Sequence, residues 1–375
     1  MIALQAHFRH IDWILLLTTL PILGAGLISM YTFVGINNFF ERQLIWIVVG
    51  LVTMFGLSVL DFRILRKTYA ILALFLFSTG LLALLFLLGS VVKGAQSWFH
   101  LGTLAFQPAD PMKLVLILLL AKYFSRRHVE IAHWKHIVIS GCYALIPFFL
   151  VLSQPDFGSA IILFAIWFGM TVVSGISKKH LFFVLSVGLF SSLFLWSFVF
   201  APYQKERIKT FLYPLTDVRG AGYNAYQSTI AVGSGELLGK GIGYGTQSRL
   251  KFLPEYQTDF IFASFAEEWG FVGVLLLLLC YGIVVWRILH AAMVGATNFE
   301  TLYALGLAIF FMTQFTVNIG MNIGLLPVTG QTLPFMSYGG SHLVTEFAGL
   351  GILMGMGRYA RVSHSENMKN EFLGI

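Results

Sequence analysis

Long apolar runs separated by short polar segments make up most of this chain. A transmembrane helix needs about 20 predominantly apolar residues. Ten runs approach that length, at residues 12–33, 41–60, 69–90, 109–125, 136–153, 158–176, 181–200, 263–288, 302–325 and 340–359. The pattern predicts an all-α polytopic membrane protein with about ten transmembrane helices, forming a single membrane domain over residues 1–375.

One polar segment interrupts the apolar pattern. Residues 202–262 form a large loop between the seventh and eighth predicted helices, and we call this loop the insert. It contains seven of the 24 Lys and Arg residues, carries eight glycines from Gly220 to Gly245, and ends with Glu255 and Asp259. A membrane protein needs a functional reason for such a loop, so we expect the insert to carry the working part of the protein.

Composition and charge agree with a membrane location. Hydrophobic residues make up 57% and charged residues 11% of the chain, whereas soluble domains carry about a quarter charged residues. Basic loops resist translocation, while long loops cross regardless of charge. The short outer loops hold only Arg42 and Lys93. With a cytoplasmic N-terminus, fourteen basic residues fall in cytoplasmic segments: Arg9, Arg63, Arg66, Lys67, Lys122, Arg126, Arg127, Lys135, Lys178, Lys179, Arg287, Arg358, Arg361 and Lys369.

This distribution predicts that both termini are cytoplasmic and that the insert is extracytoplasmic. The formal net charge of +7 follows from the same asymmetry, so no nucleic-acid partner is predicted. The two cysteines, Cys142 and Cys280, fall inside predicted helices, and no disulfide framework or cysteine-based metal cluster is implied.

Polar side chains at membrane depth are costly and invite a functional interpretation. Gln314, Asn318 and Asn322 recur every four residues in the ninth predicted helix, which places three amides on one helix face. Two interpretations stay open. The amides form hydrogen bonds between helices, or they line a polar groove that receives a head group.

Two helix starts carry candidate anion sites. Asp110 precedes Pro111 and predicts a helix N-cap, and Lys113 lies three residues further on the same face. This pair is either a simple ion pair or a phosphate contact through Lys113 that Asp110 holds in place. Before the last predicted helix, Gly340 and Ser341 leave free backbone N–H groups, which suit either an anion or an ordinary capped turn.

Carboxylates gather where the insert meets the eighth predicted helix. Thr258 or Asp259 can cap this helix, and Glu267 and Glu268 follow inside it. Asp259 and Glu267 lie about 80° apart around the helix axis, so they can face a common side. Carboxylates opposite a basic loop suit acid–base chemistry or metal binding. Within the insert, residues 206–215 mix basic and apolar positions and predict a short amphipathic helix at the interface.

A series of short motifs runs through nearly the whole chain. They are Lys93-Gly94-Ala95-Gln96-Ser97-Trp98, Phe106-Gln107-Pro108, Gln154-Pro155-Asp156, Gly220-Ala221-Gly222-Tyr223, Gln227-Ser228, Gly233-Ser234-Gly235, Gly239-Lys240-Gly241, Gly245-Thr246-Gln247-Ser248, Phe252-Leu253-Pro254-Glu255, Thr258-Asp259-Phe260-Ile261-Phe262-Ala263, Ala266-Glu267-Glu268 and Ser337-Tyr338-Gly339-Gly340-Ser341. In their order and spacing these motifs resemble the SEDS family (shape, elongation, division and sporulation), most closely its RodA branch.

The resemblance implies a peptidoglycan glycosyltransferase of the bacterial cytoplasmic membrane that polymerises lipid II into glycan strands during cell elongation. Members have ten spans, a large outer loop between spans seven and eight, and an essential Asp at the end of that loop, which is Asp259 here. The implied partners are lipid II, the nascent glycan strand, membrane lipid and a class B penicillin-binding protein, the transpeptidase of the elongation (rod) complex, which crosslinks the new strand.

On this basis Asp259 is the candidate base for the 4-hydroxyl of the acceptor GlcNAc, which displaces undecaprenyl pyrophosphate from C1 of the donor MurNAc with inversion. Positive groups stabilise the departing pyrophosphate. The candidate substrate-binding residues are Gln107, Asp110, Lys113, Arg207, Lys240, Glu255, Asn318, Asn322, Ser337 and Ser341. A divalent cation, Mg²⁺ or Mn²⁺, could assist, although the sequence contains no dedicated set of ligands for it.

Three other functions stay open: a lipid II flippase or transporter, a septal (FtsW-like) polymerase, and a scaffold that regulates the transpeptidase. The insert favours a transferase because it ends in a carboxylate, and a flippase needs no base. The chain also departs from the family at two places. The family often has Gln-Pro-Ser-Glu where this chain has Gln107-Pro108-Ala109-Asp110, and Arg where it has Ser97. The carboxylate is therefore kept with a shorter reach, and a phosphate contact from that Arg is in doubt.

Overall fold

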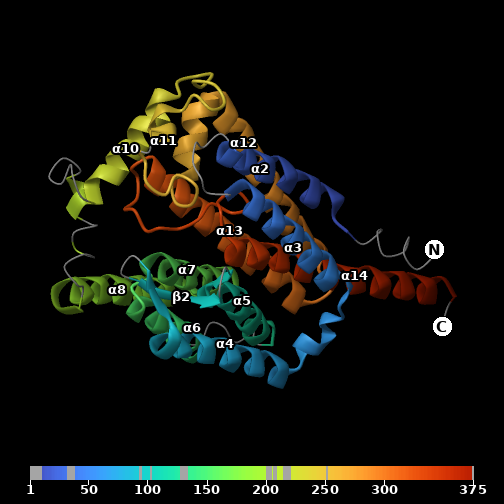
Figure 1. Ribbon diagram of the computed structural model, residues 1–375. Coiled ribbons are helices and arrows are strands. Elements are labelled where there is room, and N and C mark those ends of the chain that lie inside the picture. Colours follow the sequence, from blue (N-terminus) through green and yellow to red (C-terminus); the bar gives the residue numbers. More distant parts are fainter. Residues whose placement is uncertain are drawn as a thin grey trace.

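The structure is a computed structural model that describes residues 11–31, 39–92, 95–101, 104–126, 134–199, 205, 209–213, 221–250 and 252–373. Each of the ten apolar runs falls on a helix of the bundle in Figure 1. These helices are α2 (Trp13–Tyr31), α3 (Phe39–Val59), α4 (Thr68–Leu88), α5 (Ala109–Ser125), α6 (Trp134–Ser153), α7 (Phe157–Val173), α8 (Lys178–Phe194), α12 (Ile261–Val294), α13 (Asn298–Asn322) and α14 (Gly340–Leu373).

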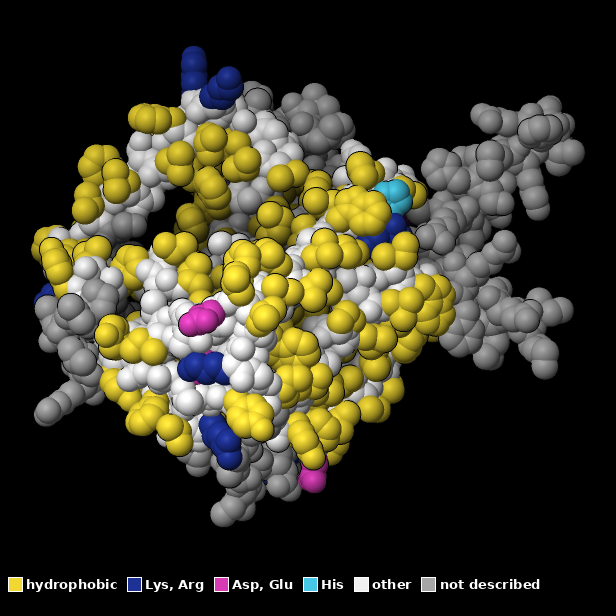
Figure 2. Space-filling model, turned by 90° about the horizontal axis from the view of Figure 1, so that it is seen from above, with side chains coloured by type: hydrophobic (Ala, Val, Ile, Leu, Met, Phe, Trp, Pro, Cys, Tyr) yellow, Lys and Arg dark blue, Asp and Glu magenta, His cyan; other side chains and the backbone are white. Residues whose placement is uncertain are grey.

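The prediction of an all-α polytopic membrane protein is confirmed. Among the described residues, seven helices are long and apolar enough to cross a membrane. The surface agrees with a lipid environment, because hydrophobic side chains cover much of the face in Figure 2. On α8, which continues as the short π-helix η2 (Leu195–Val199), Phe182 and Phe183 remain exposed.

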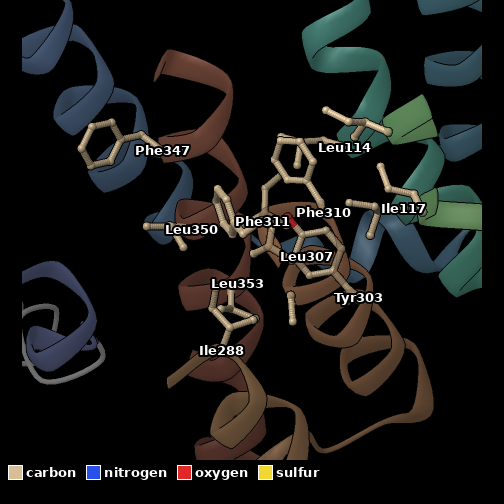
Figure 3. Close-up of a cluster of buried hydrophobic side chains, with 14 of the residues drawn as sticks. Leu114, Ile117, Ile288, Tyr303, Leu307, Phe310, Phe311, Phe347, Leu350 and Leu353 are labelled. Carbon is tan, nitrogen blue, oxygen red and sulfur yellow. The ribbon is translucent and has the colours of Figure 1, made fainter. Parts of the chain in front are cut away.

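The core of the bundle lies where α5, α12, α13 and α14 meet. Figure 3 shows large apolar side chains from all four helices in one cluster, among them Leu114, Ile288, Phe310 and Leu350. Small residues allow the backbones to approach here: a β-carbon on Gly306 would lie 2.7 Å from Cγ2 of Ile117. Helices in a membrane associate without a hydrophobic driving force between them. They depend on close van der Waals packing, which small residues at the interface allow.

Two ion pairs tie helices together at the end of the bundle opposite the insert. Arg287 of α12 pairs with Asp12, just before α2, at 2.8 Å, and Arg66 of the short helix η1 (Phe62–Arg66) pairs with Glu300 of α13 at 2.6 Å. In Figure 1 the start of α2 and the end of α14 lie at this same end.

A small antiparallel sheet joins α4 to α5. Its strands are β1 (Ser90–Val92), β2 (Ala95–Leu101) and β3 (Leu104–Phe106), in the order β1-β2-β3. Oγ of Ser97 in β2 donates a hydrogen bond of 3.2 Å to the carbonyl oxygen of Gln154. The sheet thereby connects the entry to α5 with the turn between α6 and α7.

The described part of the insert folds over the first turns of α12. It contains the turn at 209–212, α10 (Ala221–Ser234) and the short helix α11 (Thr246–Arg249). The predicted amphipathic helix at 206–215 is described only at 209–213, of which 209–212 are helical.

The helix α12 is broken in its upper part. Gly270 has φ 64° and ψ −169°, a backbone conformation that interrupts the helical hydrogen bonds and that glycine adopts without steric cost. The insert satisfies the groups that the break sets free. The carbonyl oxygens of Glu267 and Glu268 accept from the N–H groups of residues 240 and 241, and the N–H groups of residues 271 and 272 donate to the carbonyls of residues 236 and 237. These four main-chain bonds measure 2.9–3.1 Å.

Candidate functional site

Asp259 lies half-buried at the end of the insert, just before α12. The amide nitrogens of Asn318 and Asn322 on α13 donate to its carbonyl oxygen at 3.1 and 3.0 Å. The predicted capping role of Thr258 or Asp259 is wrong, because α12 begins after Phe260, which makes no side-chain cap. Two buried amides therefore hold the main chain of Asp259 in place of a helix cap.

The same amides form hydrogen bonds between helices, which was one of the two interpretations of their spacing. Nδ2 of Asn318 also donates to the carbonyl of Gln331 at 2.6 Å, and Oδ1 of Asn322 accepts from the N–H of Ala263 at 3.2 Å. Oγ of Ser228 on α10 donates to the carbonyl of Asn322 at 2.8 Å. The side-chain amides of Asn318 and Asn322 therefore link α13, the insert and the start of α12.

The loop between α13 and α14 supports Asp259 from the other side. Oγ of Ser337 donates to the carbonyl of Thr258 at 2.7 Å, and the N–H of Tyr338 donates to the carbonyl of Gln257 at 2.8 Å. Gly330, with φ 74°, lies beside the carboxylate, because a β-carbon there would stand 3.5 Å from Oδ2 of Asp259. The backbone at Gly330 therefore lies within van der Waals reach of the carboxylate, in a conformation that glycine adopts without steric cost.

Glu255 lies four residues before Asp259 in a strained turn, with φ 50°. Its Oε2 accepts a hydrogen bond of 3.3 Å from Oγ1 of Thr258. Burial, together with the charge of Glu255, raises the pKa of the neighbouring Tyr256 phenol. The phenol therefore keeps its proton at neutral pH, because its pKa already starts near 10.

Lys113 and Asp110 form a buried ion pair on the first two turns of α5. Nζ of Lys113 lies 3.0 Å from Oδ1 of Asp110, and both side chains are less than 5% exposed. The predicted N-cap role of Asp110 is wrong, because α5 begins at Ala109 and Asp110 lies within its first turn. Oδ2 of Asp110 is buried without a hydrogen-bond partner. A buried polar atom in that condition costs free energy unless a ligand or water meets it.

The sequence interpretation overlooked Glu346, a fully buried carboxylate on α14. Its Oε2 accepts from the N–H of Phe335 at 2.8 Å, and its Oε1 accepts from Nε2 of Gln314 at 3.5 Å. A lone Glu inside the apolar run 340–359 was the signal that could have identified it, because ionisable residues at membrane depth are rarely idle.

Gln107 and Ser341 join the starts of three helices. Ser341 Oγ accepts from the N–H of Gln107 at 3.2 Å and donates to its carbonyl at 3.3 Å. Nε2 of Gln107 donates to Oδ2 of Asp156, the N-cap of α7, at 2.7 Å. In this arrangement Ser341 makes contacts within the protein at the start of α14.

An apolar groove of about 500 Å³ begins at this junction and runs between α3, α4, α5 and α14. Its walls include Trp46, Phe77, Phe106, Leu114, Val344 and Ser341. The groove is thus lined by hydrocarbon along most of its length and reaches polar groups at the Ser341 end. This is the arrangement expected for a ligand with an apolar tail and a polar head.

Lys240 forms an ion pair with the buried carboxylate of Glu267. Its Nζ lies 2.7 Å from Oε1 of Glu267, which also accepts from the N–H of Thr246 at 2.8 Å and of Gln247 at 3.2 Å. Glu267 therefore holds the glycine-rich part of the insert against α12. Glu268 acts similarly, since its Oε1 accepts from the N–H of Gly243 at 3.1 Å.

The structure brings most of the candidate residues to one end of the bundle. Asn318 and Asn322 bond directly to Asp259, and Ser337 and Glu255 bond to the preceding residue, Thr258. Arg207 lies outside the described residues. Across the described ranges, no three His, Cys, Asp or Glu side chains converge in a way that could hold a metal ion. The divalent cation therefore stays a prediction.

Comparisons with known proteins match most of the chain and point to one family. The family model FTSW_RODA_SPOVE, described as cell cycle protein, matches residues 8–362. Peptidoglycan glycosyltransferase MrdB of Escherichia coli (strain K12) is 38% identical over 92% of this chain and 93% of its own length. Stage V sporulation protein E of Bacillus subtilis (strain 168) is 35% identical over 93% of this chain and 98% of its own length.

Solved structures give the same result. A structure of a peptidoglycan synthase complex contains a chain with a TM-score of 0.80 and 31% identity, covering 93% of this chain and 98% of that one. The rod shape determining protein RodA of Thermus thermophilus has a TM-score of 0.70 and 31% identity, covering 92% of this chain and 96% of that one. This chain belongs to the family of cell cycle proteins named for FtsW, RodA and SpoVE.

Proposed function

We propose that this protein is a peptidoglycan glycosyltransferase that polymerises lipid II into glycan strands. The observation that carries the proposal is that Ser337 donates a hydrogen bond to the carbonyl of Thr258, the residue before Asp259, and lies four residues before Ser341 in the lining of the apolar groove. A lipid-linked sugar places its tail in hydrocarbon and its reacting carbons in water, so its enzyme needs such a pairing of groove and carboxylate. The relatives named above as peptidoglycan glycosyltransferases support this substrate class.

In the proposed reaction, Asp259 accepts the proton of the acceptor GlcNAc 4-hydroxyl as that oxygen bonds to C1 of the donor MurNAc. The bond between C1 and the pyrophosphate oxygen breaks with inversion, and the pyrophosphate leaves with both bonding electrons. The asparagine amides and Ser337 fix the main chain around Asp259, which keeps its carboxylate oriented without reorganisation during the reaction.

Lys113 is the candidate partner for the departing pyrophosphate. It is a buried cation whose only described ion-pair partner is Asp110, and a cation in a low-dielectric site stabilises developing negative charge strongly. Asp110 orients the ammonium group through its Oδ1. At the start of α14, Nε2 of His342 lies 3.2 Å from the carbonyl of Ser337, whose Oγ donates to the carbonyl of Thr258 beside Asp259.

The proposal extends to location and partner. The reaction takes place on the extracytoplasmic side of the bacterial cytoplasmic membrane, with both termini in the cytoplasm. A class B penicillin-binding protein crosslinks the product, in keeping with the matched chain from a complex that coordinates polymerization and crosslinking.

The test is polymer formation from purified lipid II by the protein together with its transpeptidase partner, with the transpeptidase blocked by a β-lactam. Wild type should yield long strands, whereas Asp259→Asn should fold with an unchanged melting temperature and yield none. Normal strand synthesis by Asp259→Asn would rule out the base assignment. Failure of wild type to make polymer, combined with transfer of lipid II between leaflets of a vesicle, would favour a flippase instead.

A further inference from the structure

A second cavity lies on the insert side of the bundle, away from the apolar groove. It has a volume of about 360 Å³ and lies between the turn at 209–212, α10 and the segment 323–328 that follows α13. Its lining includes Thr210, Phe211, Asn224, Tyr226, Thr229 and Val328. The volume falls within the range of about 300–1,000 Å³ that is typical of ligand sites.

The wall of this cavity is also a wall of the Asp259 region. Val328 packs against a small buried cluster that contains Phe260, the residue after Asp259. Ile323 lines the cavity and directly follows Asn322, whose amide nitrogen lies 3.0 Å from the carbonyl oxygen of Asp259. The segment from 323 to 330 thus runs from the cavity to Gly330 beside the Asp259 carboxylate.

The chemistry of the lining distinguishes between possible occupants. The described part of the lining contains two aromatic rings, an amide and three hydroxyl groups, and it contains no charged side chain. A pyrophosphate or a charged stem peptide would call for Arg or Lys. An acyl chain would bury the hydroxyl and amide groups without giving them hydrogen-bond partners, which costs free energy. A sugar ring offers an apolar face for an aromatic side chain and hydroxyl groups for polar ones, so it matches both parts of the lining.

We propose that this cavity binds sugar units of the glycan strand next to the unit that reacts at Asp259. This inference rests on the proposed glycosyltransferase function and adds a strand-holding subsite to it. A strand held at a second position stays bound between additions, so the subsite sets the length of the product. Tyr226 is the proposed aromatic contact, because it lines the cavity and is 42% exposed.

The first test measures strand length at matched consumption of lipid II. Tyr226→Ala removes the aromatic face, and Ala225→Trp fills the cavity; each should shorten the mean strand several-fold relative to wild type. Tyr244→Ala is the matched control, because Tyr244 is an exposed aromatic residue of the same insert that does not line the cavity. Unchanged strand length in both cavity variants would overturn the proposal.

The second test does not depend on catalysis. Purified Asp259→Asn protein, which has lost the candidate base, should bind radiolabelled soluble glycan made of uncrosslinked GlcNAc–MurNAc repeats without stem peptides. Adding Tyr226→Ala should weaken this binding at least tenfold, while adding Tyr244→Ala should not. Equal binding with and without the Tyr226 ring would overturn the subsite even if wild type polymerises lipid II. Conversely, loss of binding with Tyr226→Ala would support the subsite even if the assignment of Asp259 failed.

Discussion

The side-chain amide of Asn322 and the main-chain carbonyl of Asp259 are joined by a hydrogen bond of 3.0 Å. Asn318 adds a second donor to the same oxygen from one turn earlier on α13. Both asparagines are fully buried. A helix in the middle of the bundle therefore determines where Asp259 lies, two residues before α12, and it does so through the backbone rather than through the carboxylate.

We expect Asn322→Ala to lower polymerisation much more than its effect on folding would suggest. Removing the amide leaves buried polar groups unsatisfied, at a cost of about 1–3 kcal/mol, and it releases the main chain at Asp259. The measurement is polymer yield from lipid II beside the thermal stability of the purified protein. Ser140→Ala is the control, because Ser140 is equally buried and bonded to Trp167, far from Asp259 in the chain. Equal losses of activity in the two variants would contradict the positioning role.

The Lys113–Asp110 pair can be tested for function apart from stability. Lys113→Met alone should destabilise the protein by roughly 3–5 kcal/mol, because it leaves Asp110 as an uncompensated buried charge. The double variant Lys113→Met with Asp110→Asn should recover most of that stability. If Lys113 contacts the pyrophosphate, the double variant should still show weakened use of lipid II across a concentration series. Recovery of normal turnover would mean that the pair serves only the fold.

Glu267 should prove to be the anchor of the glycine-rich part of the insert. Glu267→Gln removes a charge that accepts hydrogen bonds from residues 240, 246 and 247, and each bond to a charged group is worth about 1.5–3 kcal/mol. Amide hydrogen exchange in residues 240–249 should therefore accelerate. Glu236→Gln, which removes a carboxylate charge from the insert itself, is the control and should leave that exchange unchanged. Slow exchange in both variants would refute the anchoring role.

The proposed orientation, with the insert outside the cytoplasm, predicts opposite labelling at the two ends of the bundle. In a background lacking Cys142 and Cys280, Leu238→Cys in the insert should react with a membrane-impermeant maleimide in intact cells. Ile64→Cys, at the other end of the bundle, should react only after permeabilisation. Both positions are exposed, with 80% and 55% of the residue surface accessible. The reverse pattern would place the insert in the cytoplasm.

The apolar runs were sufficient to predict the helices because spanning a membrane imposes both length and composition. The small sheet at residues 90–106 was missed, since three short strands carry little periodic signal. The break at Gly270 was also missed, because a glycine inside an apolar run is ordinary in membrane helices. The break is stabilised by main-chain hydrogen bonds to the segment 236–241, which lies more than twenty residues away in the sequence.

The sequence predicted which residues belong to the candidate site, but it did not predict which of them contact one another. The spacing of Asn318 and Asn322 indicated a shared face, but not that both would bind one carbonyl oxygen. Lys240 was interpreted by its charge as a pyrophosphate contact, which no observation tests, and the structure pairs it with Glu267. The distances between such groups depend on how α12 and α13 pack, and that information is spread over the whole chain.

The broken helix α12 has a consequence for the order of biosynthesis. Residues 236–241 leave the ribosome before residues 267–272, which supply their main-chain hydrogen-bond partners. The insert therefore cannot complete its own fold on emerging from the membrane, and must wait until the following helix has been inserted. The fold of the insert is therefore complete only when α12 is in place, so a chain that fails to insert α12 also lacks a completed insert.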